Sequence, residues 1–255
     1  GPRYSSTIGS STKIMLSKGR IALFSYGIMS IAITLFNKAV LSSYHFSHAM
    51  FLTLCQSSFT LFCLVVLKRI GWIQYEDFDI NTAKKVAPLS IIFLAYVVIS
   101  LSALGAVNVP MFAGLRRTTI LIVLAAEYLF MSKVPSKKTI LATSIMTIGA
   151  IIAAMKDLTY DPVAYILVGL TNLSTAGYTV SIARVKAQTN LSVFAMLFYN
   201  TVMTLPFLLA IVLASGELQA VSEFEFISDA GFLCLFACSS FMAFALNVAT
   251  FYSTR

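Results

Sequence analysis

Long apolar stretches separated by short polar connections dominate the chain. A helix that crosses a bilayer needs roughly 20 apolar residues. Eight stretches meet or approach this length, namely residues 21–44, 46–67, 86–107, 109–131, 139–155, 163–183, 193–214 and 230–252. Most connections between them are too short for a further folded domain. The pattern predicts an all-α integral membrane protein, a polytopic helical bundle, with a polar tail at residues 1–20 and one transmembrane domain at residues 21–255.

The composition supports this prediction. Hydrophobic residues make up 58% of the 255 residues and charged residues only 11%, whereas a soluble domain carries about 25% charged residues. The mean hydropathy is +0.87. So few charges could not cover the surface of a soluble protein, so lipid is expected to surround most of the chain.

The basic residues test the topology. An even number of spans puts both ends of the chain on one side, and cytosolic loops are enriched in lysine and arginine. The predicted non-cytosolic loops hold only Lys156. The predicted cytosolic segments hold Arg3, Lys13, Lys18, Arg20, Lys68, Arg69, Lys84, Lys85, Lys133, Lys137, Lys138, Arg184, Lys186 and Arg255. This bias predicts a cytosolic N-terminus and explains the net charge of +8 without a nucleic-acid partner.

Two sequons and a histidine pair are not expected to be functional sites. Asn172 and Asn190 each begin Asn-Leu-Ser, but the topology puts the first inside the sixth span and the second in a cytosolic loop. Neither is therefore expected to be glycosylated. His45 and His48 have no acidic or cysteine neighbours in sequence, so no metal site and no cofactor are expected.

Four charged residues lie inside predicted spans, where charge is costly and usually marks function. They are Lys38, Arg116, Arg117 and Glu127. Snorkelling to the headgroups is an equal alternative for Lys38. It suits adjacent arginines less well, because neighbours on a helix point about 100° apart. Guanidinium groups match phosphate oxygens in a bidentate fork, so Lys38, Arg116 and Arg117 are candidate ligands of a diphosphate.

Two further positions are gating candidates. Glu127 comes eleven residues after Arg116, about three helical turns, so the two should share a helix face. A structural ion pair near the headgroups is the favoured alternative for Glu127. Pro206 lies inside the seventh span and removes a backbone hydrogen bond there. It is expected to kink the helix, as a static bend or as a hinge.

An aromatic residue beside an amide opens the seventh span. Tyr199 can stack on a base or donate a hydrogen bond, and Asn200 can donate and accept. The pair is a candidate site for a nucleobase. An interfacial anchor is the ordinary alternative for a tyrosine near a helix end.

Taken together, these residues resemble the nucleotide-sugar transporter family of the drug/metabolite transporter superfamily. The resemblance rests on Leu-Phe-Asn-Lys at 35–38, Val-Pro-Met-Phe at 109–112, Leu-Arg-Arg at 115–117, Glu127 and Phe-Tyr-Asn at 198–200. The Leu-Arg-Arg form is most similar to the branch that carries UDP-sugars. Phe-Tyr-Asn is similar to the Phe-Tyr-Asn-Asn motif of GDP-mannose transporters, but Thr201 replaces its last residue.

The resemblance implies a fold of ten helices in two inverted five-helix repeats, with a cavity near the midplane. Residues 21–155 would form the first repeat and residues 163–255 an incomplete second one. The chain is therefore expected to end within the second repeat and not to transport by itself. The implied binding residues are Asn37, Lys38, Arg116, Arg117, Tyr199 and Asn200.

The implied activity is exchange of a cytosolic nucleotide-sugar, preferably a UDP-sugar, for a luminal nucleoside monophosphate, in the Golgi or endoplasmic reticulum membrane. The sequence leaves the oligomeric state open, and a homodimer is one alternative. The alternatives are a GDP-sugar transporter, a plastid-type sugar-phosphate translocator and an integral-membrane enzyme. The enzyme would need His, Asp or Glu clustered at the membrane surface. The acidic loop at residues 215–229 has carboxylates but no histidine, so no enzyme is expected.

Overall fold

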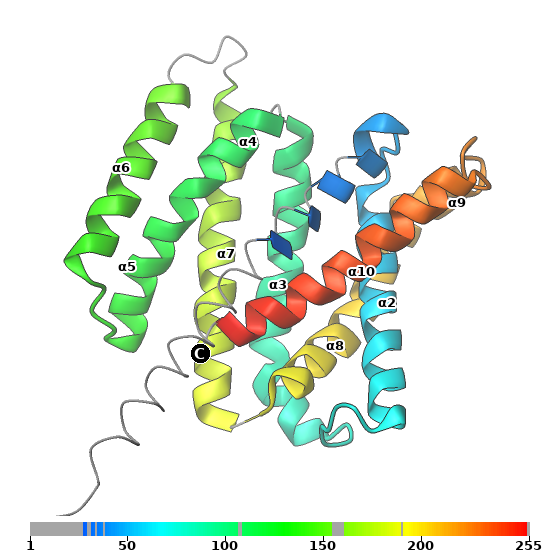
Figure 1. The fold of residues 1–255 in the computed structure, drawn as a ribbon, viewed down its shortest axis with the longest axis horizontal. Helices are drawn as coiled ribbons and strands as arrows, with labels where there is room; N and C mark the ends of the chain where they lie inside the picture. Colours follow the sequence, from blue (N-terminus) through cyan, green and yellow to red (C-terminus); the bar gives the residue numbers. More distant parts are fainter. Residues whose placement is uncertain are drawn as a thin grey trace, which may run out of the picture. The chain divides into compact units, whose positions relative to one another are not determined.

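The computed structural model describes residues 28, 29, 32, 33, 35–37, 39–106, 109–154, 161–189 and 191–253. Every regular element in these ranges is helical (Figure 1). The chain divides into two compact units, which we call the terminal unit (Gly1–Gln74 with Gly216–Arg255) and the central unit (Tyr75–Ser215). The predicted all-α, polytopic membrane architecture is confirmed at this level. The predicted inverted repeats at residues 21–155 and 163–255 stay a prediction.

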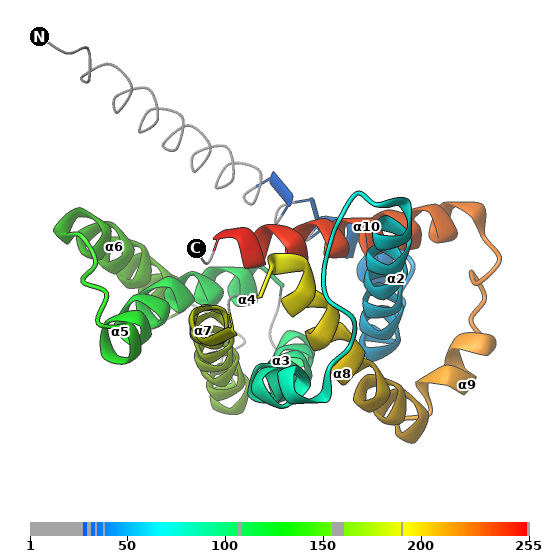
Figure 2. The same ribbon diagram turned by 90° about the horizontal axis from the view of Figure 1, so that it is seen from below.

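The central unit is a bundle of antiparallel helices. Its elements are α3 (Ile80–Ala106), α4 (Val109–Leu115), the 3₁₀ turn η2 (Arg116–Thr118), α5 (Thr119–Met131), α6 (Lys137–Ala154), α7 (Pro162–Thr189) and α8 (Val193–Ala214). Helix α7 packs against both α3 and α5, and α3 also packs against α8. Figure 2 shows α7 between α5 and α3. Successive long helices run in opposite directions (Figure 1), as short loops between membrane-crossing helices require.

Basic residues gather at one end of the central unit. The beginnings of α3 and α6 and the ends of α5 and α7 lie at its lower end in Figure 1. At this end, the Arg184 guanidinium of α7 lies 5.9 Å from the ring centre of Phe130 in α5. The other basic residues of these four helix ends are Lys84, Lys85, Lys133, Lys137, Lys138 and Lys186. This grouping supports the prediction that they face one side of the membrane.

The terminal unit joins the two ends of the chain. Its elements are the π-helical η1 (Ala39–Ser43), α2 (Ala49–Ile70), the short α9 (Glu217–Ser222) and α10 (Ala230–Ser253). Helix α10 packs along α2 and against η1. An aromatic core joins these elements, because Phe46 is buried against Phe224 and Phe232 at ring-centre distances of 5.1 and 5.4 Å.

The acidic loop caps two helices of the terminal unit. The first N–H groups of a helix have no partner within the helix and favour a negative charge. The Glu217 carboxylate accepts a hydrogen bond from the Phe51 N–H in the first turn of α2, at 2.7 Å. The Asp229 carboxylate accepts one from the Phe232 N–H of α10, at 2.8 Å. These two carboxylates therefore stabilise the N-termini of α2 and α10.

Five of the described helices are long and apolar enough to cross a membrane: α2, α3, α7, α8 and α10. Of the predicted span at 21–44, residues 21–27, 30, 31, 34 and 38 lie outside the described residues. The predicted span at 139–155 corresponds to α6. The span at 109–131 is not one α-helix, because the 3₁₀ turn η2 divides it into α4 and α5. The prediction of an unbroken fourth helix was wrong.

The third span also begins earlier than its apolar pattern indicates. Helix α3 starts at Ile80 rather than at residue 86, and Pro88 lies inside it. Asp79 caps the new start, since its carboxylate accepts hydrogen bonds from the Thr82 N–H and hydroxyl at 2.8 and 2.9 Å. Hydropathy locates the entry into the membrane, whereas a polar cap sets where the helix begins.

Candidate functional site

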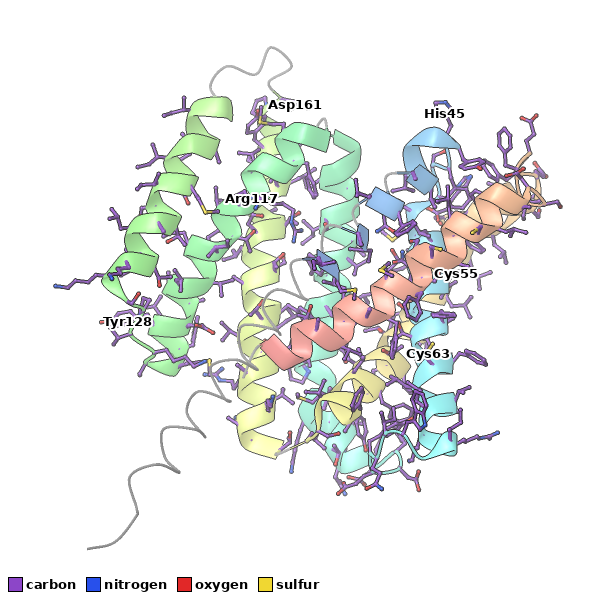
Figure 3. All side chains as sticks on the ribbon, in the orientation of Figure 1. His45, Cys55, Cys63, Arg117, Tyr128 and Asp161 are labelled. Carbon is purple, nitrogen blue, oxygen red and sulfur yellow. The ribbon has the colours of Figure 1, made fainter. Side chains whose placement is uncertain are left out.

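The two arginines of the fourth span occupy the turn between α4 and α5. Arg116 and Arg117 are the first two residues of the 3₁₀ turn η2, and Figure 3 labels Arg117 at this junction. A 3₁₀ turn advances about 120° per residue instead of 100°, so three residues add a rotation of about 60°. The expected three-turn register from Arg116 to Glu127 assumed an unbroken helix and does not hold.

Arg116 lies among aromatic and polar side chains of the central unit. Its guanidinium carbon is 5.6 Å from the ring centre of Tyr96 in α3 and 5.7 Å from that of Phe112 in α4. Its Nη1 lies 3.5 Å from the Ser100 hydroxyl oxygen, to which it donates. Aromatic faces attract a cation and leave most of its N–H donors unused. Arg116 is thus held in place by two aromatic rings and a hydroxyl group.

The aromatic support continues into α7. The Tyr96 and Tyr178 rings are nearly parallel, with an interplanar angle of 8° and centres 6.3 Å apart. Phe93 lies beside Tyr178 at 5.2 Å. Stacked rings of this kind hold each other's orientation. The ring beneath Arg116 is therefore anchored to two helices rather than one.

Arg117 points elsewhere. Its side chain is exposed, and it lines a shallow open hollow of about 390 Å³ together with Gly114, Met146 and Ala150. The two arginines therefore have different surroundings: aromatic rings for Arg116, an open hollow beside α6 for Arg117.

Asn172 of α7 binds the turn that carries both arginines. It is only 3% exposed. Its amide nitrogen donates to the Leu115 carbonyl at 3.1 Å and to the Thr118 hydroxyl at 2.8 Å. Its oxygen accepts from the Thr119 hydroxyl at 2.7 Å. The Thr118 hydroxyl in turn donates to the Leu115 carbonyl at 2.8 Å. These contacts bracket η2 on both sides.

Asn37, predicted as a ligand, belongs to a polar cluster of the terminal unit. Its side-chain oxygen accepts hydrogen bonds from the Gln56 amide at 3.0 Å and the Ser239 hydroxyl at 2.5 Å. The Gln56 amide also donates to the Ser239 oxygen at 2.7 Å. Lys38 lies outside the described residues. The convergence of Lys38 with Arg116 on one phosphate stays a prediction.

Tyr199 and Asn200, the predicted base contacts, differ in their bonding. The Tyr199 hydroxyl donates to the Asp77 carbonyl at 3.1 Å and accepts from the Asp79 N–H at 2.8 Å. It therefore ties α8 to the loop before α3. Asn200 is 2% exposed, and its side-chain oxygen has no hydrogen-bond partner among the described residues. The role of both residues in base contact stays a prediction.

The two gating candidates are placed as follows. The Glu127 carboxylate lies 3.6 Å from the Lys133 ammonium, which is an ion pair at the partly exposed end of α5. Helix α8 continues without interruption from Val193 to Ala214, through Pro206. A gating role for either residue stays a prediction.

Several residues around the candidate site were not predicted from the sequence, among them Gln56, Ser239 and the Asn172 side chain as a ligand of the turn. A signal existed, because amides and hydroxyls inside apolar spans hydrogen-bond across helices. The predicted site rested on charged residues within the spans, and Asn172 was considered only as a sequon. Asn37 and Ser239 could not be paired from the sequence, since 202 residues separate them.

No protein-family model matches the chain, but curated relatives do. The chain is 32% identical over 252 residues to the UDP-N-acetylglucosamine transporter UGNT1 of Arabidopsis thaliana, covering 94% of this chain and 73% of the relative. It is 33% identical over 229 residues to the nucleotide sugar transporter SLC35D2 of Homo sapiens, covering 90% and 68%. It is 32% identical over 234 residues to the UDP-sugar transporter UST74c of Drosophila melanogaster, covering 92% and 62%.

Each relative is longer than the part that the chain matches. The matches nevertheless run through nearly the whole chain. All three relatives are transporters by name rather than enzymes. The chain belongs to the nucleotide-sugar transporter family.

Proposed function

We propose that the protein carries a nucleotide-sugar, preferably a UDP-sugar, across the Golgi or endoplasmic reticulum membrane in exchange for a nucleoside monophosphate. The observation that carries this proposal is the arginine pair at the break between α4 and α5. Two adjacent arginines in an apolar span are costly unless an anion uses them. The UDP preference follows from the relatives whose names specify UDP-N-acetylglucosamine and UDP-sugars.

The two arginines would contact the diphosphate in different ways. Arg117 is exposed beside the hollow and would make the first contact with an arriving phosphate. Arg116, held over the Tyr96 ring, keeps free N–H donors and would complete a bidentate contact. Both the nucleotide-sugar and the monophosphate are anions, so one basic site serves both directions of exchange.

The base would be read by Asn200. A buried acceptor without a partner costs roughly 1–3 kcal/mol, and a ligand N–H would recover that cost. The Asn200 oxygen is such an acceptor, whereas the Tyr199 hydroxyl already has two backbone partners. Of the two predicted base contacts, Asn200 is therefore the one with bonding capacity left.

Uptake into proteoliposomes tests the exchange. The complete natural protein that contains these residues is reconstituted, and uptake of labelled UDP-N-acetylglucosamine is compared in vesicles preloaded with UMP and in empty vesicles. Preloading is expected to stimulate uptake. Equal uptake in both would refute exchange, and faster uptake of a GDP-sugar or a triose phosphate would refute the UDP preference.

Matched arginine variants test the site. Arg116→Lys keeps the charge but loses the planar fork, so we expect about tenfold slower uptake, the loss of one charge-assisted hydrogen bond. Arg184→Lys is the control, because Arg184 also lies near an aromatic ring, 5.9 Å from the Phe130 centre, but at the end of its span. Equal effects of the two variants would contradict the assignment of Arg116.

A further inference from the structure

We infer that Asn172 is a positioning residue that holds the 3₁₀ turn η2 and thereby sets the direction of Arg116 and Arg117. The inference rests on the proposed function of these arginines. Its observation is the set of contacts from one buried side chain of α7 to Leu115, Thr118 and Thr119. Arg116 and Arg117 lie between the first and the second of these residues in sequence.

The bonding pattern explains why this turn needs a partner. Hydrogen bonds of a 3₁₀ turn have poorer geometry than those of an α-helix. Within an apolar bundle no bulk water is available to compensate. The Leu115 carbonyl, the last of α4, receives the Asn172 amide and the Thr118 hydroxyl. These donors therefore stabilise the turn against an uninterrupted α-helix.

The contacts also fix the turn from both directions. Asn172 uses its amide nitrogen toward the residues on the α4 side and its oxygen toward Thr119, the first residue of α5. An apolar residue could fill the same space but could not do both. Neighbouring threonines of α7 do not bond to another helix in this way. The Thr171 hydroxyl donates to the Leu167 carbonyl, and the Thr175 hydroxyl donates to the Thr171 carbonyl. The inter-helix role is thus particular to Asn172 in this stretch.

The consequence for the site is a rotation. Without Asn172, the Thr119 hydroxyl can return to a carbonyl of its own helix, and η2 can relax into an α-helix. That change removes about 60° of rotation between α4 and α5. Arg116 would then leave the position in which it now contacts Tyr96 and Ser100.

The variant Asn172→Leu tests this, with Thr171→Val as the control. Thr171 is also buried and precedes Asn172 in α7, but its hydroxyl donates to the Leu167 carbonyl of its own helix. Two quantities are measured in the complete protein: the dissociation constant for UDP-N-acetylglucosamine, and the helical phase of α5 from the oxygen accessibility of spin labels placed singly at residues 120–126.

We expect Asn172→Leu to shift the phase of α5 by about 60° and to weaken binding about tenfold, the loss of one charge-assisted hydrogen bond. Thr171→Val should change neither. An unchanged phase, or a shifted phase with unchanged affinity, would overturn the inference. If the parent protein binds neither UDP nor UDP-N-acetylglucosamine, the proposed function fails, and the phase alone decides whether Asn172 holds the turn.

A second pair of variants guards against misfolding of the first. Thr119→Val removes the hydroxyl that donates to the Asn172 oxygen, while Thr119→Ser keeps it. We expect Thr119→Val to weaken binding and to shift the phase of α5 in the same direction as Asn172→Leu. Thr119→Ser should keep the affinity and the phase of the parent protein. Identical behaviour of the valine and serine variants would contradict a role of this hydrogen bond.

Discussion

The Gln56 amide of α2 donates a hydrogen bond to the Asn37 oxygen, 19 residues earlier, at 3.0 Å. Both belong to apolar stretches, where an amide side chain lacks bulk water and can hydrogen-bond to a residue of another helix. Ser239 of α10 completes the cluster, since it donates to Asn37 and accepts from Gln56. This contact therefore ties the two ends of the chain together within the terminal unit.

A double-mutant cycle measures that contact. We expect Gln56→Leu and Asn37→Leu each to lower the free energy of unfolding in detergent, with a coupling energy of about 0.6 kcal/mol, typical of inter-helix hydrogen bonds in membranes. Additive effects would show that the pair is not coupled. Ser58→Ala is the control on α2, because the Ser58 hydroxyl donates to the Leu54 carbonyl of its own helix.

Tyr199→Phe separates the ring of Tyr199 from its hydroxyl. The variant keeps the ring beside Phe78, 5.3 Å between centres, and loses both backbone contacts of the loop before α3. We expect a destabilisation of about 1–2 kcal/mol and faster hydrogen exchange at the Asp79 amide. Tyr128→Phe, at an exposed tyrosine of α5, should leave both quantities unchanged. If Tyr199→Phe weakens nucleotide binding without faster exchange, the hydroxyl contacts the ligand rather than the loop.

Asp79 makes the stability depend on pH. Hydrogen bonds from the Thr82 backbone N–H and hydroxyl favour the carboxylate and lower its pKa below the ordinary value. A lowered pKa in the folded state contributes stability above the unfolded pKa, and this contribution is lost as the pH falls through the folded pKa. The melting temperature should therefore drop below about pH 4. Asp79→Asn, which still caps a helix, should show a smaller drop, and an equal drop would contradict the role of Asp79.

Asn200→Leu should uncouple stability from binding. Leucine has a similar shape and removes a buried oxygen that lacks a partner, so the variant is expected to be as stable as the parent or more stable, by up to about 1–3 kcal/mol. Nucleotide binding should nevertheless weaken, because the acceptor for the base is gone. Thr204→Val is the buried control on α8. A stable Asn200→Leu variant with unchanged affinity would exclude Asn200 from the base site.

Glu127→Gln distinguishes an ion pair from a gate. The partner of Glu127 is Lys133, at 3.6 Å, and both side chains are partly exposed. Such pairs contribute about 0–1 kcal/mol, so the melting temperature should hardly change. If Glu127 is a gate, Glu127→Gln should slow the exchange of substrate across the membrane by more than its small effect on stability explains. Lys133→Gln is the matched variant, and a pair that acts only on stability predicts unchanged uptake for both.

Part of the site could be predicted from the sequence because charge in an apolar run is conspicuous. Arg116 and Arg117 were selected on this ground and lie at the break of the fourth span. Gln56 and Ser239 were not selected, because uncharged polar residues are common in spans and gain meaning only from a partner. Tyr199 was read from its neighbours in sequence, which gave no indication of the loop backbone that it binds.

The sequence by itself determined that the chain forms apolar helices and that its basic residues gather at the helix ends. Each residue's hydropathy and charge decide whether it is more stable in lipid or in water, so local composition is enough for this. The tertiary structure decided where the fourth span breaks and what surrounds each arginine. Those features depend on α7, which brings Asn172 to within 3.1 Å of the Leu115 carbonyl, 57 residues away. A hydrogen bond between residues far apart in sequence cannot be predicted from local composition, so it is known only from the packing of the helices.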